Sequence, residues 1–133
     1  MQLKQNTVII DADVVLRYLL KDDEDLFKQA NKIFEEIFAG KKTVYILQSV
    51  IAEIVYVLKG VYDVDKKEIA EVLTELLKSK NIKTQDKQTV IDALNLYANK
   101  NLDFVDCLIC AYGGNYSVLT FDKKLNKCLK EKG

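Results

Sequence analysis

Histidine and proline are both absent from this chain of 133 residues, and glycine occurs only five times. Without histidine, the Ser-His-Asp and Cys-His catalytic arrangements and histidine metal ligands are excluded. General-base chemistry would have to come from carboxylates, lysines or a metal-bound water. The scarcity of proline and glycine leaves no stretch typical of a flexible linker, and the length predicts one domain over residues 1–133.

The chain also lacks a net charge, because 20 lysine and arginine residues balance 20 aspartate and glutamate residues. A sequence-tolerant nucleic-acid binder is usually clearly basic, so any contact with nucleic acid is expected to be local or assisted by a cation. No apolar run approaches the roughly 18 residues of a membrane-spanning helix. Residues 1–6 lack the apolar core of a secretory signal, so we predict a cytoplasmic protein.

Cysteine is scarce, and its odd number, three, argues against the disulfide framework of a secreted protein. Cys107 and Cys110 have the C-x-x-C spacing that can indicate a redox pair or a zinc site. They fall within an expected helix and have no second pair of ligands. We therefore interpret them as small residues of the core.

Short, β-branched apolar stretches alternate with stretches whose apolar residues recur at helical spacing. We expect strands at 7–10, 42–47, 81–84 and 116–122, and helices at 14–20, within 21–40, and at 49–60, 63–80, 86–101, 102–114 and 123–133. Asp22 or Asp23 is expected to cap the second helix, and Ser49 the third. This alternation predicts parallel strands joined by helical crossovers, and hence an α/β sandwich.

Four carboxylates stand out because their sequence neighbours are apolar: Asp11, Glu53, Asp106 and Asp122. Asp11 and Asp122 each follow an expected strand, where sites form in open parallel sheets. An isolated ionised carboxylate in an apolar environment must gain a partner, a proton or a metal ion. Mg²⁺ and Mn²⁺ prefer oxygen ligands and would relieve the repulsion within such a cluster. The donor set is therefore suited to the hydrolysis of a phosphodiester or a phosphate ester.

Structural roles remain open for these acidic residues. Helix caps are possible or expected at Asp11, Asp13, Asp103 and Asp122. Glu53 could instead form a buried ion pair with Lys59 or Arg17. Each carboxylate taken alone is thus a weak signal, and their joint order along an α/β pattern is the stronger one.

The chain resembles the PIN-domain nucleases, and among them the VapC-type toxins of toxin–antitoxin pairs. The matching stretches are "VIIDADVVLRYLLKDD", "LQSVIAEIVYVLKG", "LDFVDCLICAYG" and "VLTFDKKL", spread over nearly the whole chain in the family's order. The family's first motif commonly carries asparagine where this chain has Asp13. Glu53, Asp106 and Asp122 match the second, third and fourth acidic positions of the family.

The resemblance implies a three-layer α/β/α sandwich and an endoribonuclease that depends on Mg²⁺ or Mn²⁺. It implies that Asp11 and Asp106 bind the metal directly and that Glu53 binds it or orients the attacking water. Asp122 would complete the outer side of the site. Thr120 would position Asp122 or the phosphate through its hydroxyl.

Further candidates have a secondary rank. Asp103 and Asp13 are secondary acids, and the candidates for RNA phosphates are Arg17, Lys123, Lys124 and Lys127, although a solvated basic face is the more common role of such residues. The resemblance also implies a homodimer and a cognate antitoxin on a separate chain.

Two alternatives to a nuclease remain. The stretch "DADVVL" also fits the opening motif of haloacid-dehalogenase-type phosphatases, in which Asp11 would be the nucleophile and Asp13 a general acid. The chain is short for that fold, and Glu53 would have no role in it. A PIN-like fold that has lost activity and serves as a binding module is the second alternative, and it is disfavoured because all four acidic positions are filled.

Overall fold

The computed structural model describes residues 7–132, so residues 1–6, on which the signal-sequence prediction rests, lie outside it. The chain forms two compact units. Unit 1 comprises the residues up to Ile54 together with Leu76–Gln85, and unit 2 comprises Val55–Glu75 and the residues from Asp86 onward. The prediction of one domain over residues 1–133 stays a prediction.

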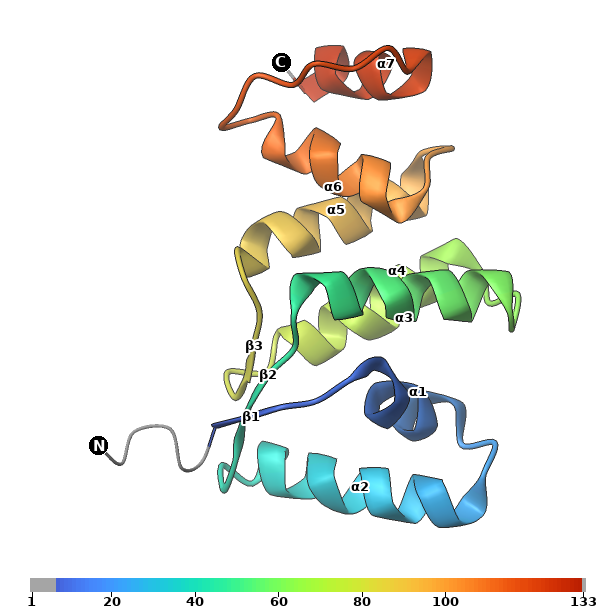
Figure 1. Cartoon of the computed structure of the whole chain (residues 1–133), viewed down its shortest axis with the longest axis vertical. Helices are drawn as coiled ribbons and strands as arrows, with labels where there is room; N and C mark the ends of the chain where they lie inside the picture. The colour runs from blue at the N-terminus through green and yellow to red at the C-terminus, as the bar shows by residue number, and fades with distance from the viewer. Residues whose placement is uncertain (1–6, 133) are drawn as a thin grey trace. The chain divides into compact units, whose positions relative to one another are not determined.

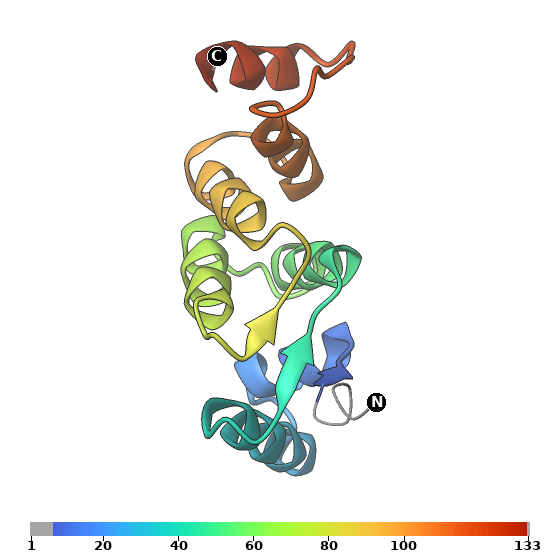
Figure 2. The same cartoon turned by 90° about the vertical axis from the view of Figure 1, so that its left-hand side faces the viewer.

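Unit 1 is built around a parallel sheet, as the sequence predicts. Its strands are β1 (Thr7–Ile9), β2 (Thr43–Tyr45) and β3 (Ile82–Lys83), in the order β1-β2-β3. Thr7 lies opposite Thr43, and Val44 lies opposite Ile82. Figure 2 shows the arrows of β2 and β3 side by side and pointing the same way. Val44 and Ile82 are fully buried, because a parallel strand is usually covered on both faces.

Two helices of unit 1 follow β1 (Figure 1). They are α1 (Ala12–Leu20) and α2 (Glu24–Phe38). Asp23 caps α2 by accepting the Leu26 N–H at 3.0 Å, as predicted. Phe34 of α2 is fully buried, and the Tyr18 ring of α1 stacks on it with 4.1 Å between ring centroids. This aromatic contact joins the two helices.

The next two helices run from one unit into the other along the chain. They are α3 (Gln48–Gly60) and α4 (Lys66–Leu77). The predicted cap at Ser49 is wrong, because α3 already includes Gln48 and Ser49. The Gln48 amide donates to the backbone oxygen of Gln85 at 3.3 Å, so a distant segment of unit 1 holds the start of this helix.

Unit 2 also contains α5 (Lys87–Asn99), α6 (Phe104–Tyr112) and α7 (Lys123–Lys132). The Phe104 ring packs edge-on against Tyr97, joining α6 to α5. A disulfide between Cys110 and Cys128 joins α6 to α7. Within residues 7–132, no helix combines the length and the apolar character needed to cross a lipid bilayer.

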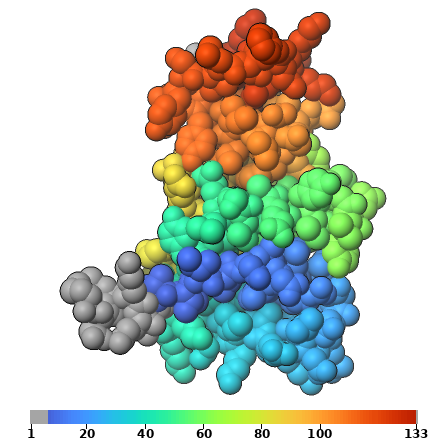
Figure 3. Space-filling model, viewed as in Figure 1, coloured from blue at the N-terminus to red at the C-terminus, as the bar shows by residue number. Residues whose placement is uncertain are grey.

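The strand predicted at 116–122 is absent from the structure. These residues form an irregular connection between α6 and α7, and the side chains of Leu119 and Phe121 are 98% and 105% exposed. Figure 3 shows the orange-to-red atoms of this part of unit 2 at the surface. The prediction fails because an apolar β-branched run becomes a strand only where a neighbouring backbone pairs with it, and all the described strands belong to unit 1.

Candidate functional site

Asp11 lies at the junction between β1 and α1 in unit 1. Its Oδ1 accepts the Val14 N–H at 3.2 Å, so Asp11 is the N-cap of α1. The capping role left open by the sequence is therefore the observed one. The carboxylate is exposed, and its second oxygen forms no hydrogen bond with residues 7–132. Capping thus leaves one oxygen of Asp11 available to a ligand.

Asp13 and Arg17 form an ion-pair cluster on α1. The Arg17 guanidinium donates to Asp13 at 3.1 Å and to Asp22 at 3.0 Å. These two hydrogen bonds raise the pKa of Arg17 above its ordinary value. The prediction that Asp13 caps the helix is wrong, because the helix begins at Ala12 and its cap is Asp11. Arg17 is accordingly held by two carboxylates.

Glu53 lies on α3 and is exposed, which differs from the buried position suggested by its apolar sequence neighbours. Ile54 and Val55 beside it are buried, whereas Tyr56, three residues on and on the same helix face, is 76% exposed. The helix is apolar on most sides but still presents this face to solvent. Neither predicted ion pair forms, because Lys59 pairs with Asp63 and Arg17 with the acids Asp13 and Asp22.

Asp103 and Asp106 lie together at the start of α6 in unit 2. Asp103 is the N-cap, and its Oδ1 accepts the Asp106 N–H at 2.9 Å. The Asp106 side chain is half-buried. Burial raises the pKa of Asp106 above its ordinary value, and the negative charges of Asp103 and then Asp122 raise it further. No described lysine or arginine forms an ion pair with Asp106.

Asp122 caps α7, as one of the structural roles left open by the sequence. Its Oδ1 accepts the Leu125 N–H at 2.9 Å. The Thr120 hydroxyl oxygen accepts the Asp122 N–H at 3.0 Å, and the Thr120 carbonyl accepts the Asn126 amide at 3.1 Å. Thr120 therefore orients the backbone at Asp122, in line with the positioning role that the resemblance implies.

The chemistry of this donor set fits a hard divalent cation. Three carboxylates of unit 2, those of Asp103, Asp106 and Asp122, are close enough for two of them to raise the pKa of the third. Oxygen ligands of this kind suit Mg²⁺ or Mn²⁺, which would remove the repulsion that burial intensifies. Among residues 7–132, no three acidic or cysteine side chains lie close enough together to bind a metal ion as they stand.

The cysteines are core residues, as predicted, but the disulfide was missed. Cys107, Cys110 and Cys128 are all buried, and Cys110 is bonded to Cys128 rather than to Cys107. Burial raises the pKa of the free Cys107 thiol to about 11. Cys107 is therefore protonated at neutral pH and is not a reactive thiolate. Nothing in the spacing of Cys110 and Cys128 distinguishes them as a pair, because only packing of α6 on α7 brings them together.

Comparison with known proteins gives a consistent result. The sequence model of the PIN domain family matches residues 8–128. A VapC ribonuclease of Aquifex aeolicus (strain VF5) is 25% identical over 130 residues, which cover 96% of this chain and 91% of that protein. No solved structure matches the chain.

Proposed function

This chain belongs to the PIN-domain family, and from that membership we propose that it is a metal-dependent endoribonuclease, the toxin of a toxin–antitoxin pair. The parallel α/β fold predicted from the sequence is confirmed by the sheet and by the family match. The match spans all four candidate acids, and the similar Aquifex aeolicus protein is a ribonuclease by name. The observation that carries the proposal is the half-buried Asp106, flanked by two acids and unpaired with any described cation.

The proposed ligands are Asp11, Glu53, Asp106 and Asp122, all of which lie within the residues matched by the PIN family model. Asp11 and Asp106 would bind Mg²⁺ or Mn²⁺ directly, and Glu53 would bind it or orient the attacking water. Asp122 would complete the outer side through the oxygen that does not cap α7. When bound, such a cation lowers the pKa of a coordinated water and stabilises charge that develops on a phosphate.

The remaining candidates have supporting roles. Asp103 holds the first turn of α6 and so orients Asp106, while Thr120 orients Asp122. Asp13 and Arg17 contribute as an ion pair beside Asp11 rather than as separate ligands. Charge-neutralising partners of RNA phosphates are then lysines, among which Lys123, Lys124 and Lys127 of α7 are exposed.

The phosphatase alternative is set aside, because the family shown by the comparison is a different one. The inactive binding module differs from the proposal only in lacking catalysis. We propose a cytoplasmic homodimer that is silenced by an antitoxin on a separate chain. A short reading frame directly upstream of the gene, encoding a protein that co-purifies with this chain, would support that pairing.

Asp106→Asn tests the nuclease. The substitution keeps the shape of the side chain and removes the charge that would bind the metal. We expect cleavage of single-stranded RNA in Mg²⁺ or Mn²⁺ to fall by about 100-fold or more, since even supporting groups of a metal site cost about 10–100-fold when removed. The measurement is the initial rate of cleavage of a fluorescent oligoribonucleotide, with EDTA as the metal-free reference.

Asp25→Asn is the matched control, because Asp25 is an exposed acid in the first turn of α2 and no described residue forms an ion pair with it. It should cleave at the wild-type rate. Expression of the wild type should arrest growth, and expression of Asp106→Asn should not. Equal cleavage and equal growth arrest from the wild type and Asp106→Asn would remove the nuclease proposal.

A further inference from the structure

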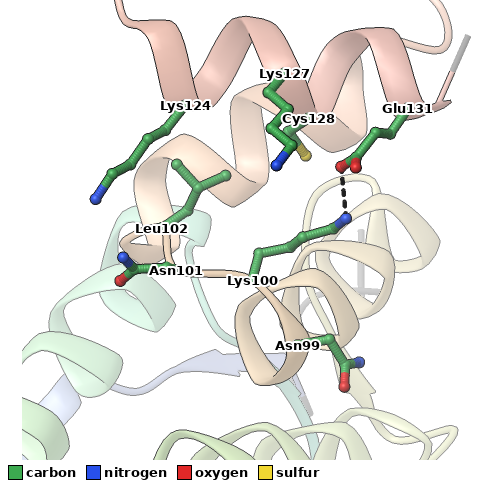
Figure 4. A pocket seen from close by; sticks show the side chains of 8 residues that line it. All are labelled: Asn99, Lys100, Asn101, Leu102, Lys124, Lys127, Cys128 and Glu131. Atoms are coloured by element: carbon green, nitrogen blue, oxygen red, sulfur yellow. Dashed lines mark hydrogen bonds and ion pairs between the residues drawn. The ribbon is translucent and has the colours of Figure 1, made fainter.

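Unit 2 contains a pocket of about 320 Å³ between α7 and the loop that joins α5 to α6. Polar residues line most of it: Asn99, Lys100, Asn101, Lys124, Lys127 and Glu131. Figure 4 shows three of these side chains, those of Lys124, Lys127 and Glu131, reaching from α7 toward the loop that carries Lys100. They share one face of α7 because their spacing of three and four residues matches the helical repeat.

The charge of this pocket is positive, although the whole chain is neutral. Lys100 donates to Glu131 at 2.6 Å, and this bond, with the nearby charge of Lys127, lowers the pKa of Glu131. Glu131 is therefore occupied by Lys100. Lys124 and Lys127 form no ion pair with any described residue, so two ammonium groups remain for a bound anion.

Both walls of the pocket are fixed to the rest of unit 2. The Lys66 ammonium donates to the carbonyl oxygens of Lys100 and Leu102 at 2.8 and 2.9 Å, and it lies 4.4 Å from the centre of the Tyr97 ring. The Cys110–Cys128 disulfide holds α7 against α6. A site whose backbone is already in place loses less conformational freedom on binding than a mobile one.

We propose that this pocket binds backbone phosphate and ribose of the RNA substrate, beside the bond that is cleaved. Lys124 and Lys127 would bind a phosphate, and the amide of Asn101 would bond to a ribose hydroxyl, since an amide both donates and accepts. Lys127 lies in the first turns of α7, the helix that Asp122 caps, about 6 Å along its axis from the first residue, Lys123, at the standard rise. A short single strand therefore spans Asp122 and Lys127.

The observations favour RNA over an acidic peptide. Lysine binds phosphate as a point charge, and the free cations in the lining are lysines. The Asn101 amide and the two lysines together match a phosphate next to a hydroxyl, the repeating unit of RNA. The inference takes the identity of the substrate, RNA, from the proposed function. What it adds is the place at which the protein binds that RNA.

The experiment measures binding without cleavage. The affinity of the wild type for a fluorescein-labelled, single-stranded oligoribonucleotide is measured by anisotropy in EDTA over a range of salt concentrations. Lys124→Gln/Lys127→Gln removes the two free charges, and we expect affinity at low salt to fall on the order of 10-fold. The slope of log K against log salt should become shallower by about 0.7 for each phosphate that the variant no longer neutralises.

Lys78→Gln/Lys80→Gln is the control pair, with the same change of charge on residues outside the pocket. It should keep the wild-type slope, and thermal melting should show that both double variants are folded. The inference is overturned if the two pairs lose affinity equally, if neither slope changes, or if the pocket variant loses binding to a poly-glutamate peptide but not to RNA. If the binding differences are as expected but the wild type does not cleave RNA, the proposed nuclease function is overturned. The proposed RNA-binding role of the pocket then still stands.

Discussion

At the scale of single residues, three acids of the candidate site combine an observed helix-capping role with a proposed role in the metal site. Asp11, Asp103 and Asp122 each use one carboxylate oxygen to cap a helix. An ionised carboxylate has two oxygens and about four lone pairs, so a cap leaves capacity for a second partner. Capping and metal binding are therefore compatible roles, and the capping observed at Asp11 and Asp122 does not compete with their proposed place in the site.

Asp106 differs from these acids because its environment opposes its charge. Its pKa is raised by burial and by Asp103 and Asp122. A carboxyl group whose pKa is higher in the folded state than in the unfolded state contributes stability at low pH. That contribution is lost as the pH rises through the folded pKa. At neutral pH without metal, the ionised Asp106 therefore destabilises the native chain.

Asp106→Asn should consequently stabilise the metal-free protein while it removes the proposed activity. We expect the melting temperature at pH 7 in EDTA to rise by about 1–2 °C, a small effect because the group is only half-buried. At a pH well below the ordinary pKa of aspartate the difference should vanish. Thermal denaturation followed by circular dichroism at both pH values measures the difference in melting temperature between the wild type and the variant. A lower melting temperature of Asp106→Asn at pH 7 would contradict the conclusion that the ionised Asp106 destabilises the native chain.

Asp103→Asn tests the same explanation from the neighbouring acid, since asparagine still caps the helix but carries no charge. It removes one of the two negative charges near Asp106 and should lower the pKa of that carboxyl. A carboxyl carbon NMR titration in EDTA follows the change directly.

At the scale of helices and strands, most elements follow from the periodicity of the sequence. Aspartate caps mark the starts of α2 and α6, and the amphipathic pattern of the other helices agrees with the structure within a few residues. The failure at 116–122 concerns a segment whose state depends on a partner. The backbone hydrogen bonds of a helix form within the helix, whereas those of a strand form with a neighbouring strand.

The disulfide joins two helices, α6 and α7, whose bonded cysteines are 18 residues apart in the sequence. Closing a loop of this length restricts the unfolded chain, with a stabilisation of about 3 kcal/mol in the chain-entropy description. Reduction of the wild type should lower the melting temperature by about 10 °C. Cys110→Ser/Cys128→Ser should already melt at the lower temperature and show no response to reductant. Unchanged melting of the wild type on reduction would contradict a stabilising bond.

At the scale of the whole molecule, neutral charge conceals separate acidic and basic regions. The acids at Asp103, Asp106 and Asp122 and the lysines of α7 lie in the same unit. A cation would bind the acidic residues, and a phosphate would bind the lysines, so each ligand would meet residues of opposite charge. This arrangement meets the requirement, set by composition, that nucleic-acid contacts be local or assisted by a cation.

A cation bound by the proposed acids should stabilise the protein, because a ligand that binds only the native state adds to its free energy of unfolding. At a Mn²⁺ concentration of about 100 times the dissociation constant, the gain is about 2.7 kcal/mol. We expect a matching rise in melting temperature for the wild type and for Asp25→Asn. Asp11→Asn and Asp106→Asn should each abolish this rise, because each removes one proposed ligand.

A full Mn²⁺ shift in Asp11→Asn would show that Asp11 is not a ligand. A full shift in both variants would remove the proposed metal site altogether.

Periodicity, capping and the placing of charges among apolar residues act over a few residues, so they were enough to predict the parallel α/β pattern, the helices and the four candidate acids. Long-range packing sets the exposure of Glu53, the irregular conformation of 116–122 and the bond between Cys110 and Cys128. It also decided that the Lys66 ammonium holds the loop beside the lysine pocket. These features depend on atoms far apart in the chain, and folding alone brings such atoms within bonding distance.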